Sequence, residues 1–162
     1  MLSFEESWRA EHEISAIIYG YADALDTGDF ERLGSYFRHG QVRVNESDDV
    51  YEGTDGVLGM FRTFTRFYDG IPCTKHVTTN LRVEVDDAGN RATAQSYFTV
   101  LQARPDFPLQ VVISGRYLDT FERLDGNWYL ADRFEYCDLI GDLRSHLVGE
   151  PVDTLKKIAA EQ

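Results

Sequence analysis

Between Pro72 and Cys137, polar and apolar residues alternate along four successive stretches of the chain. A period of two is typical of β-strands with one buried face, because successive side chains of a strand point to opposite faces of the sheet. Turn-forming residues separate the stretches. The strands predicted in this way cover residues 75–85, 91–103, 109–124 and 128–137. Short connections make neighbouring strands antiparallel, so we expect the second half of the chain to form a sheet.

The beginning of the chain shows helical spacing instead. Ser3 and Glu6 have the spacing of a capping box, and apolar residues then recur every three or four positions as far as Leu25. Thr27 and Gly28 end this pattern. It predicts one long amphipathic first helix.

Shorter elements are expected between this helix and the sheet. Asp29 is a suitable N-cap for a short second helix, and Thr54 for a third. A brief strand is predicted between these helices at 41–44. Helices followed by a meander of strands indicate the α+β class, with the helices packed on one face of a strongly curved sheet.

The whole chain is expected to form one domain. Its 162 residues contain no linker, repeat or low-complexity segment, and a chain of this length is within the range of a single domain. The domain then covers residues 1–162, of which 138–162 are expected to form a tail made of a loop and a marginal helix at 154–162.

The charge of the chain limits its partners. It has 16 Lys and Arg against 28 Asp and Glu, a net charge of −12. That charge repels a phosphate backbone, so nucleic acid and anionic membranes are not expected as partners.

The nine Tyr, ten Phe and two Trp are more rings than a core of this size needs. Because aromatic side chains also line small-molecule pockets, a small apolar or aromatic ligand is the expected partner.

The cysteines and the N-terminal residues indicate a cytoplasmic protein. Cys73 and Cys137 are far apart and lack CxxC spacing, so neither a disulfide framework nor a structural zinc site is predicted. The first 13 residues are rich in charge and have neither the apolar core of a signal peptide nor the length of a membrane span.

No sequence motif of a cofactor site or of a known class of hydrolase is present, since GxGxxG, GxxxxGK[ST], GxSxG and HExxH are all missing. A site must therefore be assembled from residues far apart in the chain, and no cofactor is predicted. Asp132, Glu135 and Asp138 lie close together but have no His at ligand spacing, which favours a solvated acidic face over a metal site.

Asp26 is the first candidate site residue. It follows Ala22 and Ile18 on the apolar stripe of the first helix, an unusual place for a carboxylate. The negative end of the helix dipole and partial burial are both expected to raise the pKa of Asp26, which suits a residue that exchanges protons or holds a cationic partner. The alternative is a turn Asp that leaves the helix before Gly28.

His76 is the second candidate. His12, His39 and His146 lie among polar residues and are expected to be exposed. Strict alternation places His76 on the polar face of its strand, so it faces a pocket only if that face lines the pocket or a bulge near Thr78 and Thr79 turns it inward. An exposed strand His without chemistry is the alternative.

Two further residues have suitable chemistry. Tyr21 lies near Asp26 on the first helix and can donate to an oxyanion or orient a carbonyl group, although core packing explains it as well. Arg133 lies in a predicted strand among apolar neighbours. There it needs a carboxylate partner or an anionic ligand, unless it occupies an exposed alternating position.

Together these residues resemble the NTF2-like superfamily, in particular its SnoaL-like and scytalone-dehydratase-like enzymes. The resemblance covers roughly residues 11–136. It is carried by YADALDTGDFERL at 21–33, KHVTTNL at 75–81 and FERLDGNW at 121–128. It implies a cone-shaped pocket between a curved sheet and the helices, commonly in a homodimer or homotrimer. It does not imply one reaction, because the superfamily includes dehydratases, dehydrochlorinases, isomerases, polyketide cyclases and non-catalytic binding proteins.

The resemblance also implies roles for residues. An Asp at the position of Asp26 orients and charges a His at the position of His76, which takes a proton from carbon. Tyr21 and Arg133 fall where bile-acid-dehydratase and dehydrochlorinase relatives bind or polarise the substrate. The expected site comprises catalytic and substrate-binding residues. The catalytic residues are Asp26, His76 and Tyr21, and the substrate-binding residues are Arg133, Asn45, Tyr97 and Tyr117.

Departures from scytalone dehydratase argue against scytalone as the substrate. That enzyme has a second active-site His on the next strand, where this chain has Leu101 and Gln102. Leu25 and Asn45 replace two of its tyrosines.

The expected activity is that of a cofactor-independent, dehydratase-type lyase acting on a small, largely apolar cyclic or aromatic metabolite. An isomerase or polyketide cyclase with the same pair, and a non-catalytic ligand-binding protein, remain as alternatives.

Overall fold

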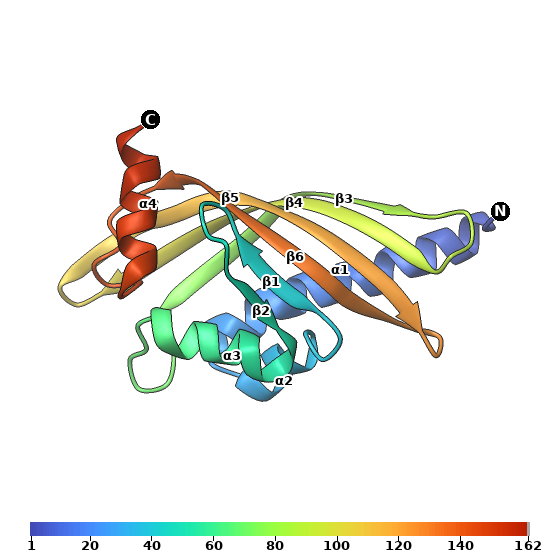
Figure 1. Ribbon diagram of the computed structural model, residues 1–162, viewed down its shortest axis with the longest axis horizontal. Helices are drawn as coiled ribbons and strands as arrows, with labels where there is room; N and C mark the ends of the chain where they lie inside the picture. The colour runs from blue at the N-terminus through green and yellow to red at the C-terminus, as the bar shows by residue number, and fades with distance from the viewer. Residues whose placement is uncertain (162) are drawn as a thin grey trace.

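A six-stranded mixed sheet curves over the N-terminal helices of the protein (Figure 1), seen in a computed structural model that describes residues 1–161. The elements, in chain order, are α1 (Phe4–Thr27), α2 (Phe30–Ser35), β1 (Gln41–Val44), β2 (Val50–Glu52), α3 (Gly53–Phe64), β3 (Thr74–Val85), β4 (Arg91–Arg104), β5 (Phe107–Leu124), β6 (Asn127–Ile140) and α4 (Glu150–Ala160). The strand order is β2-β1-β6-β5-β4-β3, and all neighbours are antiparallel except β1 and β6, which run parallel. The predicted α+β class is confirmed.

Helix α1 begins and ends where its sequence signals lie. The backbone N–H of Glu6 donates to Oγ of Ser3, and the backbone N–H of Ser3 donates to Oε2 of Glu6, at 3.2 and 2.9 Å. These two bonds form the predicted capping box. Gly28 ends the helix with a φ of 71°, in the left-handed region that glycine adopts without steric cost. Asp29 caps α2 as predicted, accepting from the backbone N–H of Arg32.

A β-bulge divides β3 and changes which of its residues face inward. The pairing of β3 with β4 shifts register between Thr79 and Arg82, and Asn80 has a φ of 54°. Before the bulge, Thr74 and His76 turn away from solvent, whereas after it the partly buried residues are Leu81 and Val83. The strict alternation used for the sequence prediction breaks here. The bulge that His76 would need is therefore present in this strand.

Three details differ from the sequence prediction. Thr54 does not cap α3, because Glu52 occupies the N-cap position and the hydroxyl of Thr54 instead donates to the carbonyl oxygen of Gly34 in α2, at 2.9 Å. Strand β2 was not predicted, since three residues are too few to show a period. Helix α4 begins at Glu150, four residues before its predicted start.

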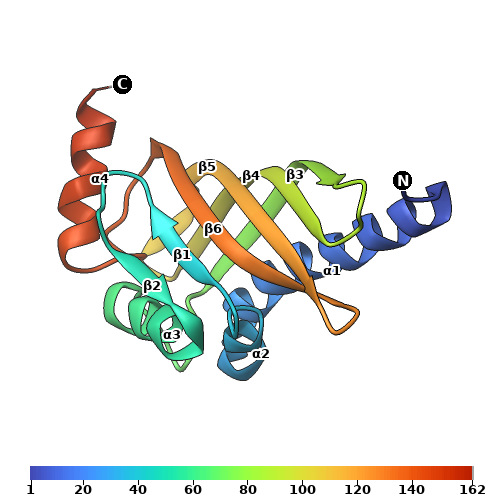
Figure 2. The ribbon, with the colours of Figure 1, turned by 45° about the vertical axis from the view of Figure 1, so that its right-hand side comes forward.

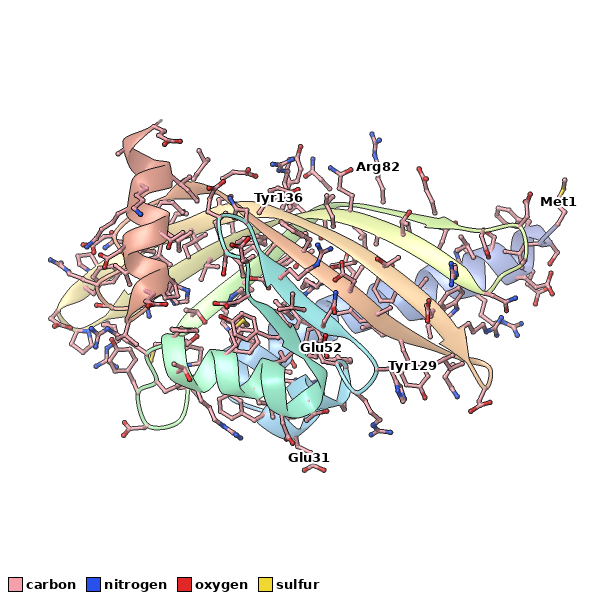
Figure 3. The ribbon with its side chains drawn as sticks, in the orientation of Figure 1. Met1, Glu31, Glu52, Arg82, Tyr129 and Tyr136 are labelled. Carbon is pink, nitrogen blue, oxygen red and sulfur yellow. The ribbon has the colours of Figure 1, made fainter. Side chains whose placement is uncertain are left out.

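The core lies between the concave face of the sheet and helices α1 to α3 (Figure 2). Helix α4 stands across one end of the sheet, where it packs against β6 and buries Leu155. Figure 3 shows Arg82 and Tyr136 projecting from the opposite face of the sheet, away from the helices. None of the helices within residues 1–161 is long and apolar enough to cross a membrane.

The bulge at Asn80 generates a stability prediction. Replacing Asn80 by Val places a β-branched side chain in the left-handed region, and we expect it to lower the free energy of unfolding by about 1–2 kcal/mol. Asn80→Gly should be nearly neutral. Thr79→Val is the matched control, because Thr79 is also exposed but has no positive φ. Chemical denaturation measures all three, and equal losses in N80V and T79V would contradict a strained backbone at Asn80.

Candidate active site

A largely apolar cavity opens between the concave face of the sheet, α1, α3 and α4. Its volume is about 180 Å³. Rings and aliphatic side chains form most of the wall, among them Phe61, Phe98 and Ile113. The groups with acid or base chemistry on the wall are Tyr21, Tyr51, His76, Tyr117, Glu135, Cys137 and His146, together with Asp49 of the β1–β2 loop and Glu150 of α4. An apolar wall with a few polar groups is the usual composition of a small-molecule site.

The carboxylate of Asp26 joins the end of α1 to the start of β3. Its Oδ1 accepts from the hydroxyl of Thr74 at 2.7 Å, and its Oδ2 accepts from the backbone N–H of His76 at 2.8 Å. Nδ1 of His76 lies 2.6 Å from Oδ1. The two side chains are only 6% and 7% exposed. The structure thus brings Asp26 and His76 together, as the sequence analysis expected.

The environment of Asp26 keeps it ionised. Burial alone raises the pKa of Asp26, but the hydrogen bonds and positive charge contributed by His76, with the bond from Thr74, lower that pKa below its ordinary value. The expectation of a raised pKa is therefore wrong. It considered burial and the helix dipole, and not the three donors that converge on this carboxylate. Because an ionised carboxylate only accepts hydrogen bonds, the proton between the two side chains lies on Nδ1 of His76.

Tyr21 and Glu135 form a second polar pair on the cavity wall. The hydroxyl of Tyr21 donates to Oε1 of Glu135 at 3.1 Å. Burial raises the pKa of the Glu135 carboxyl, which favours its protonated form. Burial also raises the pKa of Tyr21, so its hydroxyl stays neutral. Sequence reasoning missed Glu135 because it grouped this residue with Asp132 and Asp138.

The predicted solvated acidic face is wrong for Glu135, which is buried on the cavity wall. Asp132 and Asp138 lie on the outer side of β6, opposite to Glu135, and form ion pairs with Arg43 and Arg116. Alternation along the strand explains the division, because the odd-numbered residues 133, 135 and 137 point to the inner side of the sheet.

Arg133 lies behind the cavity wall. It is fully buried and makes a bidentate pair with Asp119 of β5, with N–O distances of 2.8 and 2.7 Å. Its guanidinium group packs between the rings of Tyr21 and Tyr117, at 4.2 and 4.0 Å from their centroids. The carboxylate partner that the sequence analysis required is therefore Asp119. The structure does not bring Arg133 to the surface of the cavity, and its charge supports the two tyrosines instead.

Of the other predicted substrate-binding residues, two line the cavity and one points to the outer side of the sheet. Tyr117 is 4% exposed and lines the cavity. Asn45 also lines it, and its Oδ1 accepts from the backbone N–H of Cys137 at 2.9 Å. Tyr97 does not join them, because it is 45% exposed and alternates with the buried Ser96 and Phe98 on β4. Its assignment to the pocket is corrected on that ground.

His146 contradicts its predicted exposure. It is 6% exposed and lies on the cavity wall, in the segment that leads from β6 to α4. Burial, with a smaller effect of the nearby His76, lowers the pKa of His146 to about 3. Arg144 and Ser145 precede it and Leu147 and Val148 follow it, a short mixed stretch that shows no period, so no local pattern revealed that this segment folds back over the cavity.

The cavity contains no obvious metal site. Within residues 1–161, no three His, Cys, Asp or Glu side chains are grouped so that they could hold a metal ion. Cys137 is buried on the wall, and burial raises the pKa of its thiol. A neutral thiol is a poor nucleophile and a poor metal ligand.

Comparison with known proteins assigns the family. Residues 6–133 match the SnoaL-like domain family, which covers most of the chain. The protein belongs to the SnoaL-like domain family. In this SnoaL-like chain the matched region includes α1, most of the sheet and both members of the Asp26–His76 pair, while His146 and α4 lie beyond it.

Individual relatives share this fold at low sequence identity. The terminal oxygenase component subunit beta 1 of terephthalate 1,2-dioxygenase from Comamonas sp is 26% identical over 140 residues, covering 79% of this SnoaL-like chain and 90% of the relative. A variant of Rv3472 from Mycobacterium tuberculosis, a protein of unknown function, has a TM-score of 0.71 at 25% identity, with 99% and 95% of the two chains covered. The hexachlorocyclohexane dehydrochlorinase LinA-type3 from Novosphingobium barchaimii LL02 has a TM-score of 0.70 at 20% identity, with 91% and 100% covered. An NTF2-like protein with a cystatin-like fold from Novosphingobium aromaticivorans has a TM-score of 0.68 at 18% identity, with 80% and 82% of the two chains covered, and it confirms the NTF2-like fold. The range of relatives leaves the reaction open.

The buried Arg133–Asp119 pair generates a second stability prediction. Asp119→Ala leaves an unpaired charge in the core, and we expect it to lower the free energy of unfolding by about 3–5 kcal/mol. Glu122→Ala is the control on the same strand, because Glu122 pairs with Arg91 on the surface and should cost less than about 1 kcal/mol. Chemical denaturation measures both. Similar losses of unfolding free energy in the two variants would show that the buried Arg133–Asp119 pair contributes no more to stability than the surface pair.

The burial of His146 generates a pH prediction. In the unfolded chain this His gains a proton as the pH falls through its ordinary pKa of 6.5, whereas in the folded protein it stays neutral down to about 3. Protons therefore bind the unfolded state first, and stability falls with pH across this window. Between pH 7 and pH 5, wild type should lose about 2 kcal/mol more unfolding free energy than His146→Gln. The exposed His39→Gln should follow wild type, and parallel curves for wild type and H146Q would refute the effect.

Proposed function

We propose that this protein is a cofactor-independent lyase of the dehydratase type, with His76 as its general base. The observation that carries the proposal is the Asp26–His76 pair on an apolar cavity wall. Ionised Asp26 holds the proton of His76 on Nδ1, so Nε2 keeps its lone pair. A neutral imidazole held in one tautomer by a carboxylate is suited to take a proton from carbon, and the imidazolium that forms is stabilised by Asp26.

Glu135 is the proposed proton donor of the same reaction. In the elimination, His76 takes a proton from the carbon next to a carbonyl group, the C–H electrons form the new double bond, and the C–O bond of the departing hydroxyl breaks. The hydroxyl leaves as water when a protonated carboxyl supplies the second proton. Glu135 lines the cavity, and its raised pKa favours the protonated form. After release of the products, solvent returns the proton from His76 to Glu135.

The cavity limits the class of substrate. An apolar cavity of about 150 Å³ is large enough for benzene, and this one has a volume of about 180 Å³. We therefore propose a substituted single-ring or small fused-ring metabolite. Aromatic and aliphatic walls favour a largely apolar ring, and the polar groups of the wall are placed to receive its oxygen substituents.

A non-catalytic role for the pair is the alternative that one observation favours. The three hydrogen bonds to Asp26 also fasten α1 to β3, which a ligand-binding protein of this fold could use for stability alone. An isomerase or cyclase would use the same base without net loss of water. If the pair is non-catalytic, mutation of His76 or Asp26 leaves the rate of the reaction unchanged. If the protein is an isomerase or cyclase, mutation lowers the rate but the wild-type product forms without loss of water.

A nitrobenzisoxazole tests the base without knowledge of the natural substrate. Removal of the C–H proton of its isoxazole ring breaks the N–O bond, forms the nitrile and gives a coloured cyanonitrophenolate. We expect His76→Ala and Asp26→Asn to lower kcat/KM for this reaction by about 10²–10⁴-fold, the usual contribution of a positioned base. His39→Ala, which removes an exposed His, should leave the rate unchanged.

The same assay can refute the proposal. A folded H76A protein with a rate within about threefold of wild type would show that His76 is no base and that its bond to Asp26 is structural. Circular dichroism and thermal unfolding confirm that each variant is folded. Product analysis with a cyclic hydroxy ketone then separates loss of water from isomerisation.

A further inference from the structure

His146 has an unusual combination of burial and missing hydrogen bonds. Its side chain is almost fully buried, and Nδ1 has no hydrogen-bond partner. Within residues 1–161, no protein group bonds either nitrogen of the ring. An unpaired polar group in the interior costs free energy, and nearly all buried polar groups in native proteins avoid this cost. Nδ1 carries this cost in any case, whereas Nε2, which also lacks a protein partner, is open to a partner from the cavity.

The backbone around His146 is held by hydrogen bonds on both sides. The N–H of His146 donates to the carbonyl oxygen of Leu143 at 2.9 Å, and its own carbonyl oxygen accepts from Arg66 N–H at 2.8 Å. The preceding carbonyl oxygen, of Ser145, accepts from Nε2 of Gln102 and from the hydroxyl of Tyr68, at 2.8 and 2.9 Å. Both sides of the segment are thereby fixed, and the backbone holds His146 at the cavity wall.

The ring nitrogens differ in what they can reach. Nδ1 is sealed from solvent, whereas the ring as a whole lies on the wall of the cavity that also contains His76. Nε2 is thus the atom that a ligand in the cavity can approach. Orphaned buried N–H groups are rarer than orphaned acceptors, which favours the tautomer with the lone pair on Nδ1 and the proton on Nε2. The low pKa of His146 keeps this imidazole neutral.

We propose that His146 is a second substrate-binding imidazole, whose Nε2–H donates to a carbonyl or hydroxyl oxygen on the ring of the ligand. This deepens the proposed lyase function and rests on it for the identity of the reaction. In the elimination, negative charge develops on the carbonyl oxygen as His76 removes the neighbouring proton. A neutral imidazole aimed at that oxygen stabilises the charge without itself losing a proton.

Two near-isosteric probes test the contact by binding. In buffer acidic enough to keep the hydroxyl of para-nitrophenol protonated, this probe and para-nitrotoluene differ only in a hydroxyl and a methyl group, so their affinities isolate the oxygen. Wild type should bind nitrophenol about tenfold more tightly than nitrotoluene, as expected for one hydrogen bond. His146→Leu should remove this difference by weakening nitrophenol binding, with nitrotoluene binding unchanged within twofold. His146→Gln, whose amide can donate, should restore part of it. Calorimetry or NMR titration provides the affinities.

Each possible result decides the proposal. Equal losses for both probes in H146L would show that the ring only fills space, and no loss for either would show that it does not contact the ligand. A wild-type protein that binds nitrophenol no more tightly than nitrotoluene, or binds neither, also overturns the contact, and this result does not depend on any variant folding.

The binding test is distinct from the test of the lyase. His76→Ala is expected to abolish elimination of the nitrobenzisoxazole while keeping the preference for nitrophenol, because the base is not needed to bind the oxygen. Loss of the preference in H146L with normal base dependence on His76 supports both proposals. Retention of elimination in H76A refutes the lyase alone.

Discussion

The carboxylate of Asp26 is the interaction on which the arrangement of the cavity depends. It accepts hydrogen bonds from Thr74 and twice from His76, and so connects the end of α1 to the first residues of β3. The approach is close: a Cβ on Gly28, just after the helix, would lie 2.4 Å from the carbonyl oxygen of Gly70. Glycine therefore permits the helix end to meet the chain before β3, and Asp26 then fixes both the position of that strand and the tautomer of His76.

The part of the cavity wall formed by Tyr21 and Tyr117 depends on the charge of Arg133, which lies behind it and not on the cavity surface. Arg133 is neutralised by the bidentate contact with Asp119, and its guanidinium face supports the rings of Tyr21 and Tyr117. Because Asp119 already compensates this cation, Glu135 lacks a partner charge of its own. The hydrogen bond from Tyr21 and the positive field of Arg133 do not offset the cost of burial, so the pKa of the Glu135 carboxyl is raised.

Sequence periodicity predicted the elements better than it predicted which side chains meet. The capping box of α1 and the strands of the meander follow from local patterns, and they were placed within a few residues. Parity failed where the chain departs from a regular strand. The bulge at Asn80 changes which alternate residues of β3 face inward. A strict period of two along the sequence cannot reveal such a shift. His146 was missed for another reason, since its burial results from a segment distant in sequence from α3 and β4 that packs against them.

The two carboxyl groups nearest the chemistry are driven in opposite directions by their surroundings. Asp26 has donors on both oxygens and a lowered pKa, whereas Glu135 has one neutral donor, deeper burial and a raised pKa. Pairs of titratable groups whose pKa values are pushed apart are a physical basis for assigning acid and base roles. This asymmetry supports the proposed roles, with His76 as the base beside Asp26 and Glu135 as the acid in the same apolar cavity. His146 differs from both, because its burial prevents protonation and leaves it suited to hydrogen bonding rather than to proton exchange.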